Sequence, residues 1–409
     1  MELAPHIVPG LADITRQTMS VESNLKVKDV VDIFQRDPSL LALPVVHDGR
    51  FSGVVNRKEL FSRHLGSPFA LDLFGKKAIS VLLEGEPPSV AAELDINAAL
   101  ERLLALDPKL EIDAVPIVSD DHCVGIMSVA DLMMKISSNQ AMLLHTLHLL
   151  SDRIREEVAT ASRIQNDLLP PSEFGFNGVT LSAGVTTSTE IGGDFYDYFV
   201  LDDHRLGLVI ADVSGHGVQS GMVTTAAKAS LHTLISKGAR TPAELLFGMN
   251  NAILATARRT LLMTCLVVVL DLARGTLTLA NAGHNFPYLY RQGTCELSLL
   301  DACSGYPLGF EGEGIYTEFT TGFEPGDTLF LYTDGLVECT DGADREFGYE
   351  RLEELLMGNA HLEPSTLRER ILASARQFNG AAPFADDVTL LAASFRNADD
   401  HDARGKGVL

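Results

Sequence analysis

Aspartates with the surroundings of metal-binding carboxylates recur through the second half of the chain. The segments that carry them are GGDFYD with Asp194, ADVSGHG with Asp212, LYTDGLVE with Asp334, and ADDVTLL with Asp386 and Asp387. In three of these segments a predicted strand meets a glycine turn, and in the fourth the acids stand just before a predicted strand. Glycine lets backbone carbonyls and water approach closely, and Mg²⁺ and Mn²⁺ prefer oxygen ligands. Carboxylates that converge from separate strands could therefore hold a pair of divalent cations.

Each segment taken alone is also typical of an ordinary polar turn with solvated charges. The same alternative applies to NAGHN, in which Asn281, His284 and Asn285 either line a site or form a polar turn between strands. The order and combination of the acidic segments are more specific than any single one.

Composition limits the class of protein. The 409 residues suggest two or three domains, and 46% hydrophobic with 21% charged residues allows a sizeable core. The net charge of −23 disfavours binding to nucleic acid or to an anionic membrane surface. No apolar run reaches the roughly 18–20 residues of a membrane span. The N-terminus lacks a secretory pattern, and five cysteines without a CxxC pair favour a reducing compartment, so we expect a cytoplasmic protein.

An internal repeat occupies residues 1–136. LPVVHDGRFSGVVNRKEL begins at Leu43 and VPIVSDDHCVGIMSVADL begins at Val115, an offset of 115 − 43 = 72 residues. Apolar positions and the Gly53/Gly125 pair keep register between the copies. Each copy predicts a helix, a strand, a turn, a second strand and a further helix, and two copies packed together would bury faces that neither buries alone.

This repeat resembles a tandem CBS domain pair, an α/β sensor module that often binds adenine nucleotides. In that family a Ser or Thr three residues before an Asp contacts the ribose. Ser128 and Asp131 match this signature, whereas Asn56 and Glu59 depart from it in the first copy. The resemblance therefore implies one nucleotide site at most. The alternative is a pair that only dimerises or transmits mechanical signals.

Residues 137–171 predict a long helical linker, possibly a coiled coil. Apolar residues recur at a mean spacing of about 3.6, which places them on one face of a helix, and Pro170 and Pro171 end the pattern. These residues are Leu143, Leu147, Leu150, Ile154, Val158, Ala161, Ile164 and Leu168. We expect this face to be buried in a homodimer, formed through the linker helix and the CBS pair; packing onto the chain's own domains is the alternative.

Residues 172–396 predict many short strands with helical interruptions, an α+β arrangement in which a β-sandwich is flanked by helices. The strands include DFYDYFVL, RLGLVIAD, LMTCLVVVLDL and DTLFLYTD, and GHGVQSGMVTTAAKASLHTLIS is the longest of the helices. Residues 397–409 are interpreted as a disordered tail.

This segment resembles the metal-dependent (PPM, protein phosphatase 2C-like) serine phosphatases of the SpoIIE and RsbU branch. The likeness covers about residues 155–395. It includes SRIQNDLLP, GGDFYD, ADVSGHG, NAGHNFPYL, GYPLGF, PGDTLFLYTDGLVE and DDVTLL in order. The family fold is a central β-sandwich flanked by helices, which agrees with the strand pattern.

The resemblance implies two divalent cations, Mn²⁺ or Mg²⁺, and catalytic roles for the acids. Asp194 would hold one ion, Asp212 would bridge both with the Val213 carbonyl as a further ligand, and Asp334 and Asp386 would complete the other site. Asp387 is the neighbouring alternative to Asp386. The resemblance also points to two residues of the eukaryotic relatives, an Arg that grips the substrate phosphate and a His that donates a proton. No Arg here matches upstream of Asp194, and His216 is displaced along its loop.

The implied function is a protein serine/threonine phosphatase in bacterial signalling, regulated by ligand binding to the CBS pair. Its implied substrate is a phosphorylated STAS-type anti-sigma-factor antagonist. The alternative is a non-catalytic, nucleotide-sensing scaffold whose phosphatase-like domain only docks partners. A metal-dependent nuclease is disfavoured by the acidic surface.

Overall fold

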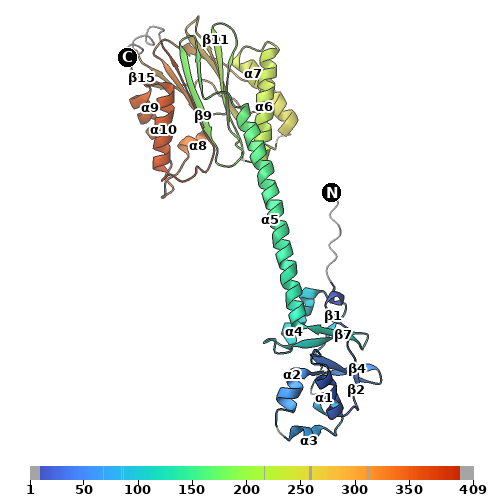
Figure 1. Cartoon of the computed structure of the whole chain (residues 1–409). Coiled ribbons are helices and arrows are strands. Elements are labelled where there is room, and N and C mark those ends of the chain that lie inside the picture. Colours follow the sequence, from blue (N-terminus) through green and yellow to red (C-terminus); the bar gives the residue numbers. More distant parts are fainter. Residues whose placement is uncertain are drawn as a thin grey trace, which may run out of the picture. The chain divides into compact units, whose positions relative to one another are not determined.

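A computed structural model of the protein describes residues 10–67, 69–83, 85, 87–215, 217–257, 260–310 and 314–396. The chain divides into an N-terminal unit, Met1–Asp152, and a C-terminal unit, Arg153–Leu409 (Figure 1). The segment 397–409, interpreted above as a tail, lies outside the described residues. Among the described residues no helix has both the length and the apolar character needed to cross a membrane.

The N-terminal unit repeats one arrangement of strands and helices. One sheet has the order β2 (Val21–Glu22), β3 (Ala42–His47) and β4 (Arg50–Asn56), and another has β1 (Thr15–Arg16), β7 (His122–Ser128), β6 (Ala114–Ser119) and β5 (Val90–Ala91). The helical segments are η1 (Leu11–Asp13), α1 (Val27–Arg36), α2 (Arg57–Glu59), η2 (Leu60–His64), α3 (Ala70–Phe74), η3 (Ile79–Leu82) and α4 (Ile96–Leu106).

The repeat offset read from the sequence recurs in the backbone. The β3–β4 hairpin and the β6–β7 hairpin have the same strand lengths, and their pairing shifts at the equivalent steps Val45/Val46 and Ile117/Val118. Each copy buries its own apolar cluster. Ala42, Ala114 and Ile126 form a third cluster drawn from both copies, so the copies pack against each other as the repeat predicts.

Helix α5 (Val129–Leu168) contains the predicted linker helix. The helix begins earlier than the predicted linker because the closing helix of the second copy continues into it without a break. Most of the apolar residues of its predicted stripe are exposed: Leu143, Leu147, Leu150, Ile154, Ile164 and Leu168. The predicted stripe therefore has no buried partner within the described chain.

The C-terminal unit is a sandwich of antiparallel sheets, which confirms the predicted α+β class. Sheet I has the order β10 (Phe195–Val200), β11 (Arg205–Val213), β12 (Met263–Asp271), β13 (Thr276–Ala282) and β16 (Phe319–Gly322). Sheet II has the order β15 (Glu296–Leu299), β14 (Tyr288–Arg291), β17 (Thr328–Tyr332), β18 (Val388–Phe395), β9 (Val179–Thr186) and β8 (Glu173–Phe176). The helices are α6 (Val218–Ser236), α7 (Pro242–Ala257), α8 (Asp334–Val337), α9 (Tyr349–Asn359) and α10 (Pro364–Phe378).

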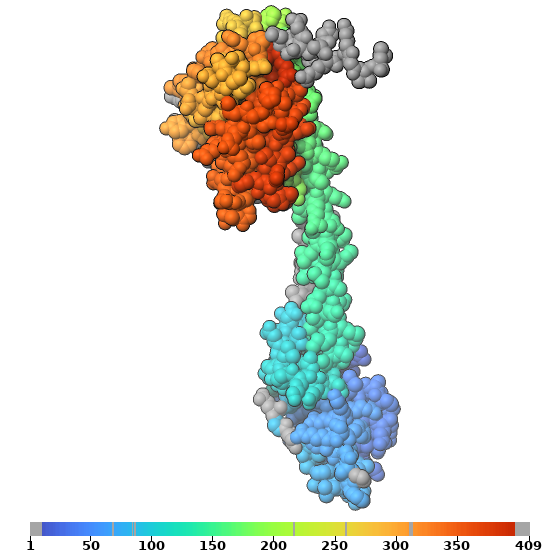
Figure 2. Space-filling model, turned by 90° about the vertical axis from the view of Figure 1, so that its left-hand side faces the viewer, coloured from blue at the N-terminus to red at the C-terminus, as the bar shows by residue number. Residues whose placement is uncertain are grey.

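Alternation along the strands gives each sheet a face toward the other sheet and a face toward helices. In β11, Leu206, Leu208 and Ile210 point into the core between the sheets, and Val209 and Ala211 point toward α6 and α7. Helices α9 and α10 cover the outer face of sheet II. The two helix pairs lie on opposite sides of the sandwich in Figure 1, and α9 and α10 form the orange-red surface in Figure 2.

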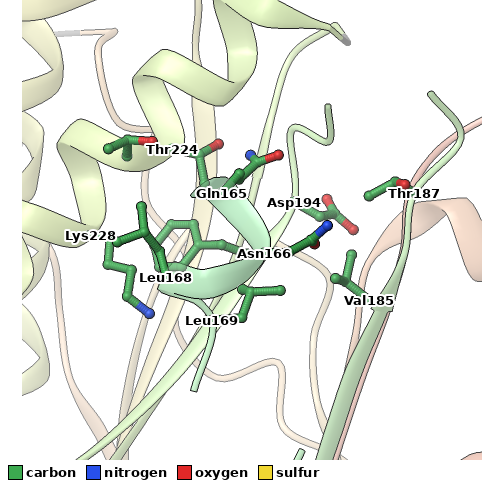
Figure 3. Close-up of a pocket in the computed structure, with 11 residues that line it drawn as sticks. Gln165, Asn166, Leu168, Leu169, Val185, Thr187, Asp194, Thr224 and Lys228 are labelled. Carbon is green, nitrogen blue, oxygen red and sulfur yellow. The ribbon is translucent and has the colours of Figure 1, made fainter. Parts of the chain in front are cut away.

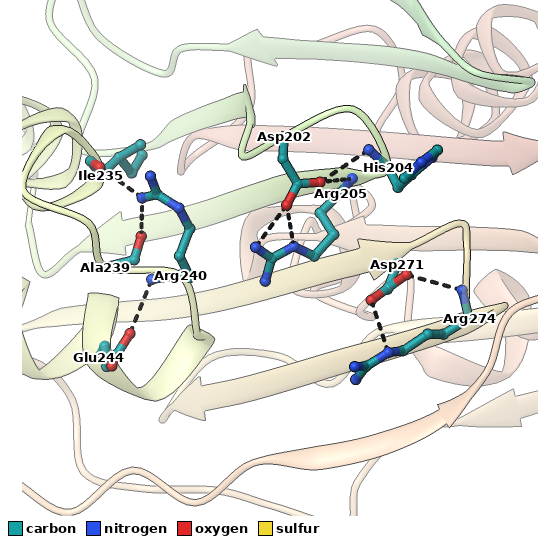
Figure 4. Close-up of polar contacts among 9 residues, drawn as sticks. All are labelled: Asp202, His204, Arg205, Ile235, Ala239, Arg240, Glu244, Asp271 and Arg274. Carbon is teal, nitrogen blue, oxygen red and sulfur yellow. Dashed lines mark hydrogen bonds and ion pairs between the residues drawn. The ribbon is translucent and has the colours of Figure 1, made fainter.

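Short polar contacts fix the connections at one end of sheet I (Figure 4). Asp202 accepts hydrogen bonds from the backbone N–H groups of His204 and Arg205 and pairs with the Arg205 guanidinium at 2.7 Å. Between α6 and α7, Arg240 donates to the carbonyls of Ile235 and Ala239. Since Arg205 opens β11 and Asp212 stands near its end, these contacts leave the opposite end of the sheet for the acids.

We expect Leu391→Ala in β18 to lower the free energy of unfolding of the C-terminal unit by about 2–5 kcal/mol. Leu391 is fully buried between the sheets, so truncation leaves a cavity. Met357→Ala on α9, where the side chain is exposed, should change it by less than about 0.5 kcal/mol. Urea unfolding, followed by hydrogen exchange of β9 and β18 peptides, measures the free energy of unfolding of each variant. Equal losses of stability in the two variants would contradict this account of the core.

Candidate functional site

The structure collects the acidic motifs at one end of the sandwich. Asp194 immediately precedes β10 and Asp212 stands near the end of β11, so both belong to sheet I. Asp334 begins α8 directly after β17, and Asp386 and Asp387 immediately precede β18, so these three belong to sheet II. Antiparallel pairing of β10 with β11 and of β17 with β18 brings these strand ends together.

The acids are close enough to raise one another's pKa values. Burial and the charges of Asp334 and Asp386 raise the pKa of Asp212 to about 7, against a hydrogen bond with Asp194 that lowers it. Burial, then the Asp212 charge, raises the pKa of Asp194 well above its usual range. Burial, then Asp386, raises the pKa of Asp334. The neighbouring charges behind all three shifts are carboxylates, so the cluster holds uncompensated negative charge.

Asp194 is held from sheet II by two threonine hydroxyls. Thr333 donates to Asp194 Oδ2 at 2.8 Å and Thr389 donates to the same oxygen at 2.6 Å. The backbone N–H of Thr389 in turn donates to Thr333 Oγ1 at 2.9 Å. These bonds oppose the effect of burial by stabilising the charged carboxylate, and they tie the start of β10 to β17 and β18.

Asp386 and Asp387 have different surroundings, although they are adjacent. Asp387 is buried, and its Oδ1 accepts hydrogen bonds from the backbone N–H and hydroxyl of Ser188 at 2.7 and 3.1 Å. Its Oδ2 accepts from the backbone N–H groups of Gly193 and Asp194 at 2.6 and 3.4 Å. Asp386 is exposed, and its charge acts on Asp212 and Asp334.

Glycines permit the close backbone approaches on which the cluster depends. A Cβ at Gly193 would stand 2.8 Å from the carbonyl oxygen of Val213, and one at Gly335 would stand 2.1 Å from the carbonyl oxygen of Asp387. Any larger residue at either position would force the motif segments apart. The Val213 carbonyl therefore lies against the GGD loop that carries Asp194.

The donor set fits hard divalent cations, which take carboxylate and carbonyl oxygens together with waters. Within the described ranges no Lys or Arg forms an ion pair with any of the five acids. In the same ranges, no three His, Cys, Asp or Glu side chains already stand in a metal-binding arrangement. Oxygens of Asp194 and Asp387 instead accept hydrogen bonds from the chain itself. Mg²⁺ sites generally need only one or two carboxylates and several waters.

Comparison with known proteins identifies both units. Residues 202–396 match the family model for Stage II sporulation protein E (SpoIIE), and residues 11–66 and 81–138 match the CBS domain. The chain thus carries a SpoIIE-family domain and a tandem CBS pair. It is 26% identical over 236 residues to phosphoserine phosphatase RsbP of Bacillus subtilis, covering 57% of this chain and 56% of RsbP.

A second relative is phosphoserine phosphatase RsbU of the same organism, 26% identical over 194 residues, covering 47% of this chain and 57% of RsbU. The chain therefore spans little more than half the length of these relatives. Among solved structures, the SiaA-PP2C domain of Pseudomonas aeruginosa aligns with a TM-score of 0.52 at 25% identity. That alignment covers 61% of this chain and 98% of the SiaA domain. The SpoIIE-family domain therefore has a PP2C-like fold.

The end of α5 is fastened to the GGD loop of the C-terminal unit. Gln165 Nε2 donates to the carbonyl of Gly192 at 2.8 Å, and the Gly192 N–H donates to Gln165 Oε1 at 3.1 Å. A small pocket beside this contact is lined by Gln165, Asn166, Asp194 and Lys228, among others (Figure 3). The side chain of Gln165 thereby fixes the residue two positions before Asp194.

The basic group of this pocket is already paired. Lys228 Nζ lies 3.1 Å from Asp197 Oδ2, and His232 Nε2 lies 2.8 Å from the same oxygen. Lys228 therefore does not replace the phosphate-gripping Arg that the sequence lacks. His216, the other residue considered for proton transfer, lies outside the described residues.

Sequence reasoning missed the residues that hold the acids in place, namely Thr333, Thr389, Ser188 and Gln165. Three of them stand inside motifs that carried the family resemblance: Gln165 in SRIQNDLLP, Thr333 in LYTDG and Thr389 in DDVTLL. Their position inside these motifs was the signal in the sequence that could have identified them. The sequence could not show that they bond across the two sheets.

The residues expected to bind a nucleotide lie at the start of α5 in the CBS pair. Ser128 is buried and Oγ accepts from the Asp131 N–H at 3.5 Å, while Asp131 pairs with Arg16 at 2.8 Å. Asp131 and Arg16 also line a cavity of about 350 Å³. A second cavity, of about 280 Å³, lies in the first copy beside Asn56, whose buried Oδ1 has no hydrogen-bond partner among the described residues.

We expect Gln165→Met to loosen the GGD loop without unfolding the domain, because the change removes both hydrogen bonds at similar side-chain volume. Hydrogen exchange at Gly192 and its neighbours should rise by at least about tenfold, since opening would cost about 1.4 kcal/mol less. Exchange in β18 should not change. Arg163→Ala, at an exposed position of the same helix, is the control. Equal protection of Gly192 from hydrogen exchange in both variants would show that the Gln165 hydrogen bonds do not hold the loop.

Proposed function

We propose that the C-terminal unit is a metal-dependent phosphatase that removes phosphate from phosphoserine or phosphothreonine of a partner protein. The observation that carries this proposal is the convergence of Asp194 and Asp212 from sheet I with Asp334 and Asp386 from sheet II. No Lys or Arg of the described ranges forms an ion pair with them. The names of RsbP and RsbU and the PP2C-like fold support the same chemistry.

The proposed ligands are Asp194, Asp212, Asp334 and Asp386, with the carbonyl of Val213. When bound, a pair of Mn²⁺ or Mg²⁺ ions would lower the pKa of a water and offset charge on the phosphoryl oxygens. The chain itself fixes the carboxylates: Thr333 and Thr389 hold one oxygen of Asp194. Gly193 admits the Val213 carbonyl of the ADVSG loop against the GGD loop, and Gly335 admits the Asp387 carbonyl against the start of α8.

We assign Asp386 as the metal ligand and Asp387 as the residue that holds the GGD loop through hydrogen bonds. Both oxygens of Asp387 already accept hydrogen bonds from the backbone that leads into Asp194. Recruiting Asp387 to a cation would break these bonds and leave buried N–H groups unsatisfied. Within the described residues Asp386 makes no hydrogen bond to the GGD loop; its Oδ1 accepts from the Asp387 N–H at 2.8 Å, and its charge acts on Asp212 and Asp334.

The proposed substrate is a phosphorylated STAS-type anti-sigma-factor antagonist. This part of the proposal rests on the resemblance to RsbU-like enzymes. The site lies at the end of the sandwich, where Asp386 is exposed. Such an open position suits a folded phosphoprotein better than a buried cleft would.

We expect Asp212→Ala and Asp334→Ala to lower Mn²⁺-dependent hydrolysis of p-nitrophenyl phosphate and of a phosphorylated STAS protein by at least about 100-fold. Each change removes a charged oxygen ligand while leaving the core intact. Asp301→Ala, at an exposed acid of the same unit, should retain activity. Near-normal turnover by a folded Asp212→Ala protein would refute the assignment, and an inactive wild type would favour the docking-scaffold alternative.

We also propose that the CBS pair binds an adenine nucleotide through Ser128 and Asp131, and that this regulates the phosphatase. The cavity of about 350 Å³ beside Asp131 supports this proposal, because its lining includes Arg16 and Lys135, whose charges suit phosphate groups. Because Asp131 is paired with Arg16, ribose binding would require this ion pair to open or to share the ligand.

Calorimetry with AMP, ADP and ATP tests the nucleotide site. Asp131→Asn and Ser128→Ala should each weaken binding by about tenfold or more, because a hydrogen bond to a charged group contributes about 1.5–3 kcal/mol. Glu59→Gln, at the equivalent place in the first copy, is the matched control. No heat from any of the nucleotides, or a stronger effect of Glu59→Gln, would overturn the assignment.

A homodimer through α5 and the CBS pair is the proposed assembly. The exposed residues Leu143, Leu147 and Leu150 follow one another at coiled-coil spacing along α5. Burying such a row against the same row of a second copy would remove apolar surface that no described segment of the chain covers.

A further inference from the structure

His284 connects the two sheets beside the proposed metal site. It follows β13 of sheet I on the connection that leads to β14 of sheet II. The side chain is only 4% exposed, and burial lowers its pKa to about 4, so the ring is neutral. A neutral imidazole has one donor and one acceptor nitrogen.

The two ring nitrogens bond to different sheets. Nε2 lies 3.1 Å from the carbonyl oxygen of Tyr332 in β17, and since a carbonyl only accepts, Nε2 must carry the proton. Nδ1 lies 2.8 Å from Thr264 Oγ1 in β12, and therefore accepts from the threonine hydroxyl. The ring thus joins β12 to β17 with both of its polar atoms satisfied.

Both partners of His284 adjoin the strand ends that carry acids. Thr264 is the cross-strand neighbour of Asp212, and its hydroxyl also lies 3.5 Å from the Asp212 carbonyl oxygen. Tyr332 is the last residue of β17, two positions before Asp334. A side-chain connection from the Asp212 strand pair to the Asp334 strand therefore passes through this ring, in addition to the hydrogen bond from Thr333 to Asp194.

The backbone of His284 is fixed independently of its ring. The His284 N–H donates to Asn281 Oδ1 at 2.7 Å, and Asn281 Nδ2 donates to the His284 carbonyl at 2.9 Å. Asn281 is itself buried at the end of β13. Within NAGHN, Asn281 and His284 are thus buried between the strands, while Gly283 is exposed and Asn285 is half-buried. The direction of the imidazole is set by its backbone and by its ring.

We propose that His284 is a positioning residue that sets the spacing of Asp212 and Asp334, and thereby the affinity of the site for divalent cations. Repulsion between these carboxylates acts to separate the sheets at this end, and the two hydrogen bonds of the ring resist that separation. The inference rests on the proposed function, because it concerns cations held by the same acids.

Calorimetric titration of the full chain with MnCl₂ tests the inference. His284→Leu removes both hydrogen bonds, and we expect the Kd for Mn²⁺ to rise by about tenfold or more, the size of effect seen when groups supporting metal ligands are lost. Thr264→Val removes one bond and should have a smaller effect. The double variant should bind no more weakly than His284→Leu, since the threonine acts through the ring.

A conservative variant, and a comparison of kcat with the Kd for Mn²⁺, distinguish a positioning role from a role in overall stability. His284→Gln can still donate toward Tyr332 and should recover part of the affinity. At saturating Mn²⁺, kcat should stay within about threefold of wild type in all variants, because the acids themselves are unchanged. Leu391→Ala, which removes core packing elsewhere in the sandwich, should lose stability while its Kd for Mn²⁺ does not change.

Two results would overturn the inference in different ways. If wild type binds Mn²⁺ and the His284 and Thr264 variants bind equally well, His284 is only a structural residue and the proposed function stands. If wild type takes up no Mn²⁺, the proposed function and the inference fall together. Should His284→Leu fail to fold, Thr264→Val and His284→Gln decide between these results.

Discussion

The structure depends on holding like charges together at the meeting point of two β-sheets. Asp194, Asp212 and Asp334 are all at least partly buried, and neighbouring carboxylates raise the pKa of each. Such a cluster is unfavourable in the absence of cations. The fold offsets part of this cost with hydrogen bonds from Thr333 and Thr389. The divalent ions that we propose would offset the remaining negative charge.

The supporting contacts join the motifs to one another across the sandwich. Asp387 fastens the GGD loop of sheet I to the start of β18 in sheet II. Gln165 fastens the same loop to α5, a continuous helix that begins directly after Ser128 of the CBS pair. The regulation that we propose would therefore act along α5 and through the hydrogen bonds of Gln165 on the loop that carries Asp194.

Patterns that depend on local periodicity could be predicted from the sequence. The 72-residue repeat, the alternating strands of the sandwich and the acids at the strand ends all follow from spacing alone. Choices that depend on side-chain direction could not be predicted. Adjacent Asp386 and Asp387 look equivalent in sequence, yet one is exposed and the other is buried against Gly193. The pairing of Asp131 with Arg16 was likewise invisible, because it joins segments more than 100 residues apart.

Anomalous diffraction from crystals of the full chain grown with Mn²⁺ is the most direct test of the central claim. The account predicts a pair of manganese peaks about 3.5–4 Å apart. Oxygens of Asp194, Asp212, Asp334 and Asp386 should surround them, and Asp387 should remain on the backbone of the GGD loop. An absence of peaks at this end of the sandwich, or coordination by Asp387 in place of Asp386, would contradict it.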